Sequence, residues 1–188
     1  MPDAQGRPLV AGAVLREQID VLKSVAGEAA VDRALDALEP EQRDSLSVVT
    51  AVSWVSLEAS NQLIENVARA IGRDPFEFNR ECTRIGVERT LKSLWRVLLR
   101  FTSDNAIITR APIFYSKNYD SGRLVAHLTD RGAAEVVLDG WPEPPPRMDV
   151  EGIGTAIATI LECAGRKDVQ MSWKRQPDGA RYMVRWAW

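Results

Sequence analysis

The side chains that most often carry chemistry are scarce in this chain. Among its 188 residues there is one His, His127, and there are two Cys, Cys82 and Cys163. A zinc site of His and Cys ligands needs several such residues at short spacings, so we expect no metal site and no metal cofactor. Two distant cysteines without a disulfide framework are typical of a reducing compartment.

Nucleophilic catalysis needs a Ser, Cys or Thr within hydrogen-bond reach of a base. His127 lies in an alternating, strand-like segment, and we expect it to face solvent or a neighbouring strand. Cys82 has an Arg on each side that would lower its pKa, but a small residue packed within a helix is the favoured interpretation. The enzyme hypothesis that stays open is a carboxylate base such as Glu81 or Asp120.

Aromatic side chains are concentrated near the end of the chain. Trp173, Trp186 and Trp188 fall in one predicted hairpin. Such residues stack across an antiparallel pair, where they cover a helix or line a pocket. Plain packing is the favoured interpretation, and an apolar ligand cavity or a protein contact is the alternative.

Charge and hydropathy exclude several function classes. The chain has 24 basic and 26 acidic side chains, a net charge of −2 and a pI near 5.6, so it lacks the basic surplus of a nucleic-acid-binding protein. No apolar stretch approaches the ~20 residues of a membrane span, and residues 1–12 do not resemble a secretory signal. We therefore expect a cytoplasmic protein. Arg outnumbers Lys, which indicates a bacterial source.

The secondary structure that must position these residues changes along the chain, from helices in the first part to mainly strands in the second. Up to residue 118 the apolar residues recur with a helical period, and a Pro or Gly interrupts them repeatedly. This pattern predicts helices over residues 12–25, 28–38, a short one from 40, 47–71, 76–101 and 104–110.

After Tyr119 the period falls to two. Strands are predicted over 123–129 and 134–138, a helix over 148–164, and a final hairpin that turns at Asp178-Gly179. The fold class is therefore α+β: an N-terminal helical layer packed on a four-stranded antiparallel sheet in the order strand–strand–helix–strand–strand. We expect a single domain over 1–188, with a helical half (1–118) and a ββαββ half (119–188).

Several segments, in this order, resemble a myxobacterial family of paralogous proteins related to the vinyl-reductase-type small-molecule-binding domain. The matching stretches are Ile71–Arg73, Ile85–Arg89, Leu94–Arg96, Tyr119–Leu124, Leu138–Pro142, Glu162–Gly165 and Val184–Trp186. The family shares its fold with haem–nitric-oxide-binding sensors and with core subunits of the TRAPP vesicle-tethering complex. Relatives bind small apolar molecules, haem or lipids, or they dimerise as adaptors. The haem sensors use a His on a helix, whereas His127 is predicted on a strand.

These observations favour a non-enzymatic regulatory or sensory module that acts through protein–protein contact, with a small apolar ligand as a further possibility. A haem or other cofactor-binding sensor is the alternative, and an enzyme with a carboxylate base is the second alternative. We expect a homodimer or a heterodimer with a related protein. The candidate pocket residues, where the long helix should meet the sheet, are Trp95, Leu99, Phe114, Tyr115, Trp141 and Trp173. The candidate interface residues are Trp54 and Leu57, in a segment too apolar for a solvent-exposed helix.

Overall fold

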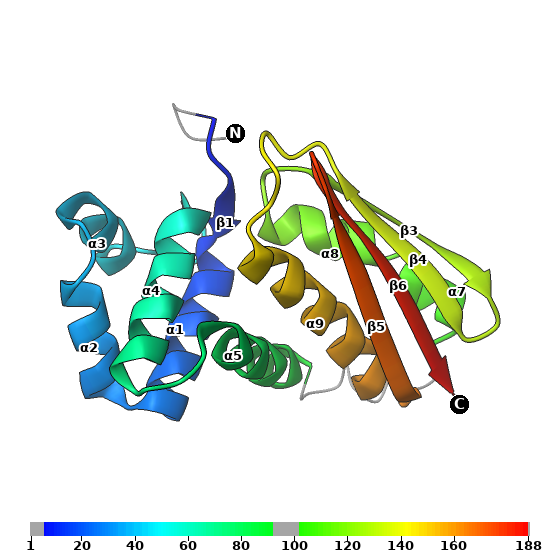
Figure 1. Ribbon diagram of the computed structural model, residues 1–188, viewed down its shortest axis with the longest axis horizontal. Helices are drawn as coiled ribbons and strands as arrows, with labels where there is room; N and C mark the ends of the chain where they lie inside the picture. The colour runs from blue at the N-terminus through cyan, green and yellow to red at the C-terminus, as the bar shows by residue number, and fades with distance from the viewer. Residues whose placement is uncertain (1–5, 92–101, 188) are drawn as a thin grey trace. The chain divides into compact units, whose positions relative to one another are not determined.

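The computed structural model describes residues 6–91 and 102–187, and it confirms the α+β fold class (Figure 1). The chain divides into two compact units. Unit 1 takes in the described residues up to Gly86 together with Asn118–Ser121. Unit 2 takes in Val87–Lys117 and the chain from Gly122 onward, within the same described ranges. The single domain over 1–188 stays a prediction.

Unit 1 is mainly helical. Its elements are β1 (Leu9–Ala11), α1 (Gly12–Ala26), α2 (Glu28–Asp36), α3 (Pro40–Ser47), β2 (Trp54–Ser56), α4 (Leu57–Ala70) and the greater part of α5 (Pro75–Thr90). The helices α1, α2 and α4 contact one another. They bury Leu15, Leu22 and Leu63 completely. Burying each of these side chains contributes about 1.5–3 kcal/mol, so the apolar stripes predicted from the sequence do form this core.

The prediction of one helix over residues 47–71 is wrong. The helix α3 ends at Ser47, the chain turns, and β2 precedes α4. The residues after Ser47 include several β-branched side chains, which lose χ1 freedom in a helix. Ser53 Oγ accepts a hydrogen bond from the Thr50 amide, and Ser56 Oγ caps α4 by accepting one from Ala59. These local hydrogen bonds compete with a continuous helix.

Two short strands that the sequence did not predict pair with each other: β1 lies before α1, and β2 lies within this interruption. The strand β1 pairs antiparallel with β2, with Val10 opposite Val55. The backbone amide of Leu9 also donates to Asp120 Oδ1 at 2.7 Å, and Val10 forms a bridge with Tyr119. Residues 118–121 therefore belong to unit 1, although they lie between two segments of unit 2.

Unit 2 contains the four-stranded sheet. Its elements are α7 (Asp104–Ile108), α8 (Ala111–Asn118), β3 (Arg123–Asp130), β4 (Ala133–Asp139), α9 (Arg147–Cys163), β5 (Lys167–Gln176) and β6 (Gly179–Ala187). The sheet order is β3-β4-β6-β5, and all neighbours are antiparallel. The four strands and the helices α7 and α9 fall within a few residues of their predicted ranges, whereas α8 was not predicted. The break after α7 falls at residues 109–110, and Pro112 is the second residue of α8.

The helix α9 packs on one face of this sheet (Figure 1). A Cβ on Gly154 would lie 3.4 Å from the ring of Tyr182, which is fully buried, so the absence of a side chain there lets helix and sheet approach closely. Alternate residues of each strand point toward α9 or away from it. The residues of β4 and β6 that point toward α9, such as Val136 and Val184, are fully buried.

The helix predicted over 76–101 is confirmed as α5 as far as Thr90; Leu91 lies in a turn, and residues 92–101 lie outside the described residues. Within the described ranges, every helix is too short or too polar to span a membrane.

Candidate functional site

A cleft of about 290 Å³ opens in unit 2 between α8 and the start of β3. It is lined by Pro112, Ile113, Tyr115, Ser116, Gly122, Arg123 and Leu124. Most of this lining is apolar, and Ser116 and Arg123 supply polar groups. A mainly apolar recess with few polar groups is the usual composition of a small-molecule site, although this cleft is at the small end of the range for such sites.

The wall of the cleft is fixed by a buried pair of aromatic side chains. Trp141 Nε1 donates a hydrogen bond of 3.0 Å to Tyr115 Oη, and both residues are buried. Gly122 lies against Trp141 with φ +76°, and a Cβ at this position would come within 2.4 Å of Trp141 Cδ1. Only glycine satisfies both the backbone conformation and this close approach.

The charged rim of the cleft is Arg123. Its Nη2 lies 3.2 Å from Asp139 Oδ2, directly across the β3–β4 pair. The hydrogen bond from Arg123 to the Asp139 carboxylate raises the pKa of Arg123, so the guanidinium stays charged. The side chain is largely exposed, and solvent screens such a pair, so that it contributes little to stability. Arg123 can therefore reorient toward a bound anion at little cost.

The structure brings together only some of the predicted pocket residues. Tyr115 lines the cleft, and Trp141 lies behind Tyr115 and Gly122. Phe114 is 51% exposed on α8, and Trp173 is 37% exposed on β5, where it lies opposite Tyr182; neither lines the cleft. Trp95 and Leu99 lie outside the described residues. A ligand-binding role for these six residues stays a prediction.

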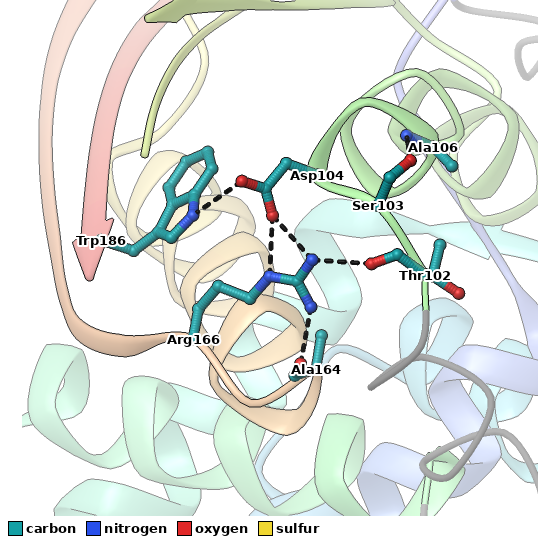
Figure 2. Close-up of polar contacts among 7 residues, drawn as sticks. All are labelled: Thr102, Ser103, Asp104, Ala106, Ala164, Arg166 and Trp186. Atoms are coloured by element: carbon teal, nitrogen blue, oxygen red, sulfur yellow. Dashed lines mark hydrogen bonds and ion pairs between the residues drawn. The ribbon is translucent and has the colours of Figure 1, made fainter. Parts of the chain in front are cut away.

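A second polar cluster, which the sequence analysis did not predict, lies where α7, α9 and β6 meet (Figure 2). Arg166 Nε donates to Asp104 Oδ1 at 2.8 Å, and Arg166 Nη2 lies 2.6 Å from the same oxygen. The other carboxylate oxygen accepts a hydrogen bond of 3.2 Å from Trp186 Nε1. All three residues are buried.

The guanidinium of Arg166 is also bound to main-chain carbonyls. It donates to Ala164 O at 2.6 Å and to Thr102 O at 2.7 Å. Ser103 Oγ meanwhile caps α7 by accepting from the Ala106 amide. Figure 2 shows the bonds to Asp104, Thr102 and Ala164 converging on the guanidinium of Arg166. Because every partner is supplied by the protein itself, the cluster stabilises the fold and offers no open ligand position.

The remaining candidates for chemistry do not form a catalytic group. The exposed His127 lies on β3 with Nε2 3.3 Å from Glu135 Oε2. Cys82 is buried on α5, and this burial raises the pKa of its thiol to about 12, so the thiolate is not populated at neutral pH. Glu81 is ion-paired with Arg73, and Asp120 Oδ1 accepts hydrogen bonds from Leu9 N and Ser121 Oγ. No cluster of metal-binding side chains occurs among residues 6–91 and 102–187.

The two candidate interface residues differ in exposure. Trp54 on β2 is 42% exposed, whereas Leu57 at the start of α4 is 6% exposed. Only Trp54 therefore offers apolar surface to a partner.

Known proteins resemble this chain in fold rather than in sequence. No protein-family model and no curated protein sequence matches the chain. Membership of the myxobacterial family therefore stays a prediction.

Solved structures of H-NOX domains match the chain over nearly its whole length. An H-NOX mutant from K. algicida, in an unliganded Fe(II) state, has a TM-score of 0.71 and 13% identity, and the match covers 95% of this chain and 97% of that one. A Cs H-NOX mutant has a TM-score of 0.68 and 14% identity, with 94% and 96% covered. An oxygen-binding H-NOX domain related to soluble guanylate cyclases has a TM-score of 0.66 and 16% identity, with 94% and 93% covered. The helical part and the four-stranded antiparallel sheet thus form an H-NOX-like fold.

Proposed function

We propose that this chain is a non-enzymatic sensory domain that binds a small molecule and signals through contact with another protein. The observation that carries the proposal is the match to H-NOX domains along more than nine-tenths of the chain. One of these relatives is described as an oxygen-binding domain, and two others as haem proteins with a distorted porphyrin. The fold thus serves small-molecule binding in each of them.

The placement of the acidic candidates supports a function without catalysis. Glu81 is neutralised by Arg73 on the surface, and Asp120 holds the amide of Leu9. Neither carboxylate is among the residues that line the α8–β3 cleft, where the polar groups are the Ser116 hydroxyl, the Arg123 guanidinium and the Tyr115 phenol. A general base needs to reach the proton that it abstracts in a bound substrate.

Haem is the ligand that the solved relatives favour, and a haem sensor is the second candidate function. Haem iron is held by His, by a Cys thiolate, by Met or by Tyr. The chain has one His, and the structure places it on the exposed side of β3, bound to Glu135. The Cys82 thiol stays protonated. Neither His127 nor Cys82 therefore fits as a haem ligand, and no step of the proposed function depends on haem.

We propose the α8–β3 cleft as the position for a small apolar ligand. The ring of Tyr115 and the side chains of Ile113 and Leu124 supply apolar contact area, and Arg123 can pair with an anionic group on the ligand. The volume of about 290 Å³ suits a compound smaller than a porphyrin.

Visible absorption and native mass spectrometry test both candidates. We expect the purified protein to show no Soret band, and added hemin to give the same spectrum with His127→Ala as with the wild type. Native mass spectra should show a bound small molecule, with less of it retained by Leu124→Trp, which fills the cleft. A Soret band that disappears in His127→Ala would replace the main proposal with the haem sensor.

A further inference from the structure

The face of the sheet that points away from α9 carries an uncovered mixture of apolar and basic side chains. We define the outer sheet face by six residues on its four strands: Val125, Val137, Lys174, Arg181, Met183 and Arg185. On β4 and β6 these residues alternate with buried residues that face α9, and Val125 on β3 and Lys174 on β5 lie opposite Val137 and Arg181 on the same face. On a solvated antiparallel sheet this outer face is normally polar, so the apolar members need an explanation.

The apolar members are neighbours across three strands. Val125 lies directly opposite Val137 on β4. Met183 lies on β6 opposite Glu135, two residues from Val137 along β4 and therefore diagonal to it. Val125 is 42% exposed and Met183 is 39% exposed. Neighbouring exposed apolar side chains bordered by polar ones are typical of a protein contact.

The charged members lie on the β6–β5 side and are basic. Lys174 lies directly opposite Arg181, and like charges in this position destabilise a sheet. Arg185 lies four residues further along β6 on the same face. The nearby carboxylates already have cationic partners: Glu135 Oε1 accepts from Arg181 at 2.7 Å, and Asp139 pairs with Arg123. The outer sheet face is thus basic, although the whole chain has a net charge of −2.

We infer that the outer sheet face is a docking surface for an acidic, amphipathic segment of a partner protein. Carboxylates of this segment would pair with Lys174 and Arg185, while its apolar side chains would cover Val125, Val137 and Met183. Complementary charge speeds association and excludes partners of like charge. The proposed function requires contact with another protein, and the outer sheet face would make this contact. The docking surface rests on the proposed function only because that function requires a partner.

Charge complementarity also favours an acidic protein segment over two other occupants, a second copy of this chain and nucleic acid. A symmetric dimer through the same face would bury the basic side chains of both copies in one interface, where like charges repel one another. Nucleic acid would pair with the cations but would leave the valines and Met183 without apolar partners. Domains that bind nucleic acid usually have more basic than acidic residues overall, and this chain does not.

A labelled peptide tests the surface directly. The probe is a fluorescein-labelled helical peptide with Glu on one face and Leu on the other, and the comparison is the same peptide with Lys in place of Glu. We expect the Glu peptide to raise the fluorescence anisotropy with added protein and the Lys peptide to leave it unchanged. Lys174→Glu with Arg185→Glu should weaken binding by about tenfold, which two exposed ion pairs supply. Met183→Ser should weaken it further.

The matched control reverses charge elsewhere. Arg16 is exposed on α1, and Arg16→Glu with Arg33→Glu changes the net charge by the same amount as the test variant. An equal loss of binding in this control would overturn the inference, because only the net charge would then matter. Tighter binding of a single-stranded oligonucleotide than of the Glu peptide would also overturn it, and so would self-association of the wild type that Arg185→Glu abolishes. All of these readouts are independent of ligand binding in the cleft.

Discussion

Asp104 and Arg166 form a buried ion pair that joins the first residue of α7 to the turn between α9 and β5. The two residues are 62 positions apart, and each has further partners, Trp186 for the carboxylate and two main-chain carbonyls for the guanidinium. A buried charge is tolerated in a protein only when it is paired and hydrogen-bonded in this way.

Asp104→Asn should lower the free energy of unfolding by about 3–5 kcal/mol, because it leaves the Arg166 guanidinium buried without a counter-charge. Urea unfolding followed by circular dichroism measures this loss. Asp139→Asn is the matched control, since Asp139 pairs with the exposed Arg123, and it should cost less than about 1 kcal/mol. Equal costs for the two variants would show that burial does not set the strength of the Asp104 pair.

Gly122→Ala should disturb the wall of the α8–β3 cleft. The new Cβ would meet Trp141 Cδ1 at 2.4 Å, so the indole must move and its hydrogen bond to Tyr115 weakens. Gly140→Ala is the control, because Gly140 has a similar φ of +75° with no atom closer than 4.0 Å. The control should lower the free energy of unfolding by only about 1–2 kcal/mol, which is the cost of a left-handed backbone conformation for a residue with a Cβ.

Intrinsic fluorescence and thermal unfolding distinguish the two glycine variants. We expect a lower melting temperature and a shifted emission maximum for Gly122→Ala, and only a smaller decrease in melting temperature for Gly140→Ala. An unchanged emission maximum in Gly122→Ala would mean that Trp141 does not rest against Gly122.

Alkaline pH should destabilise the protein through Cys82. Burial raises the pKa of its thiol to about 12, whereas the ordinary value is 9.0. Between these values the unfolded chain releases the thiol proton and the folded chain keeps it. The unfolded state therefore gains stability as the pH rises, and the free energy of unfolding falls by at most about 1.4 kcal/mol per pH unit.

Urea unfolding at pH 8.5, 9.5 and 10.5 measures this slope, and Cys82→Ala should be less steep than the wild type. At pH 8 the same thiol should resist iodoacetamide until the protein is unfolded. Rapid alkylation of Cys82 in the folded protein, identified by peptide mapping, would contradict the raised pKa.

Periodicity was enough to predict most of the fold. Every strand of the large sheet and the crossing helix α9 follow from the spacing of apolar residues and from turn residues. The exceptions are α8, the interruption of the helix predicted over 47–71, and the strands β1 and β2, which have three residues each. Such short strands have too few residues to show a period of two, and they form because Leu9 finds partners at Ser56 and Asp120, far away in the sequence.

The sites were less predictable because they depend on long-range pairing. Asp104 was predicted only as the start of a short helix, and nothing in the sequence singles out Arg166, because the two residues are 62 positions apart. Tyr115, Trp141 and Phe114 were all predicted to line one pocket. The structure joins Tyr115 and Trp141 by a hydrogen bond, but it exposes Phe114 to solvent. The sequence does contain one signal for the cleft: Gly122 in the stretch Tyr119–Leu124, where the turn requires a positive φ.

Trp54 is the residue on which the predicted homodimer can be tested. It is 42% exposed on β2, and Trp is enriched among residues that dominate binding energy. If this surface pairs two copies, light scattering should give a dimer for the wild type at micromolar concentration and a monomer for Trp54→Asp, with a nearly unchanged melting temperature. Leu57→Ala serves as the contrast, because Leu57 is buried and its truncation should cost about 2–5 kcal/mol of stability. A monomeric wild type would contradict the homodimer, and dimers in Trp54→Asp would place the contact elsewhere on the chain.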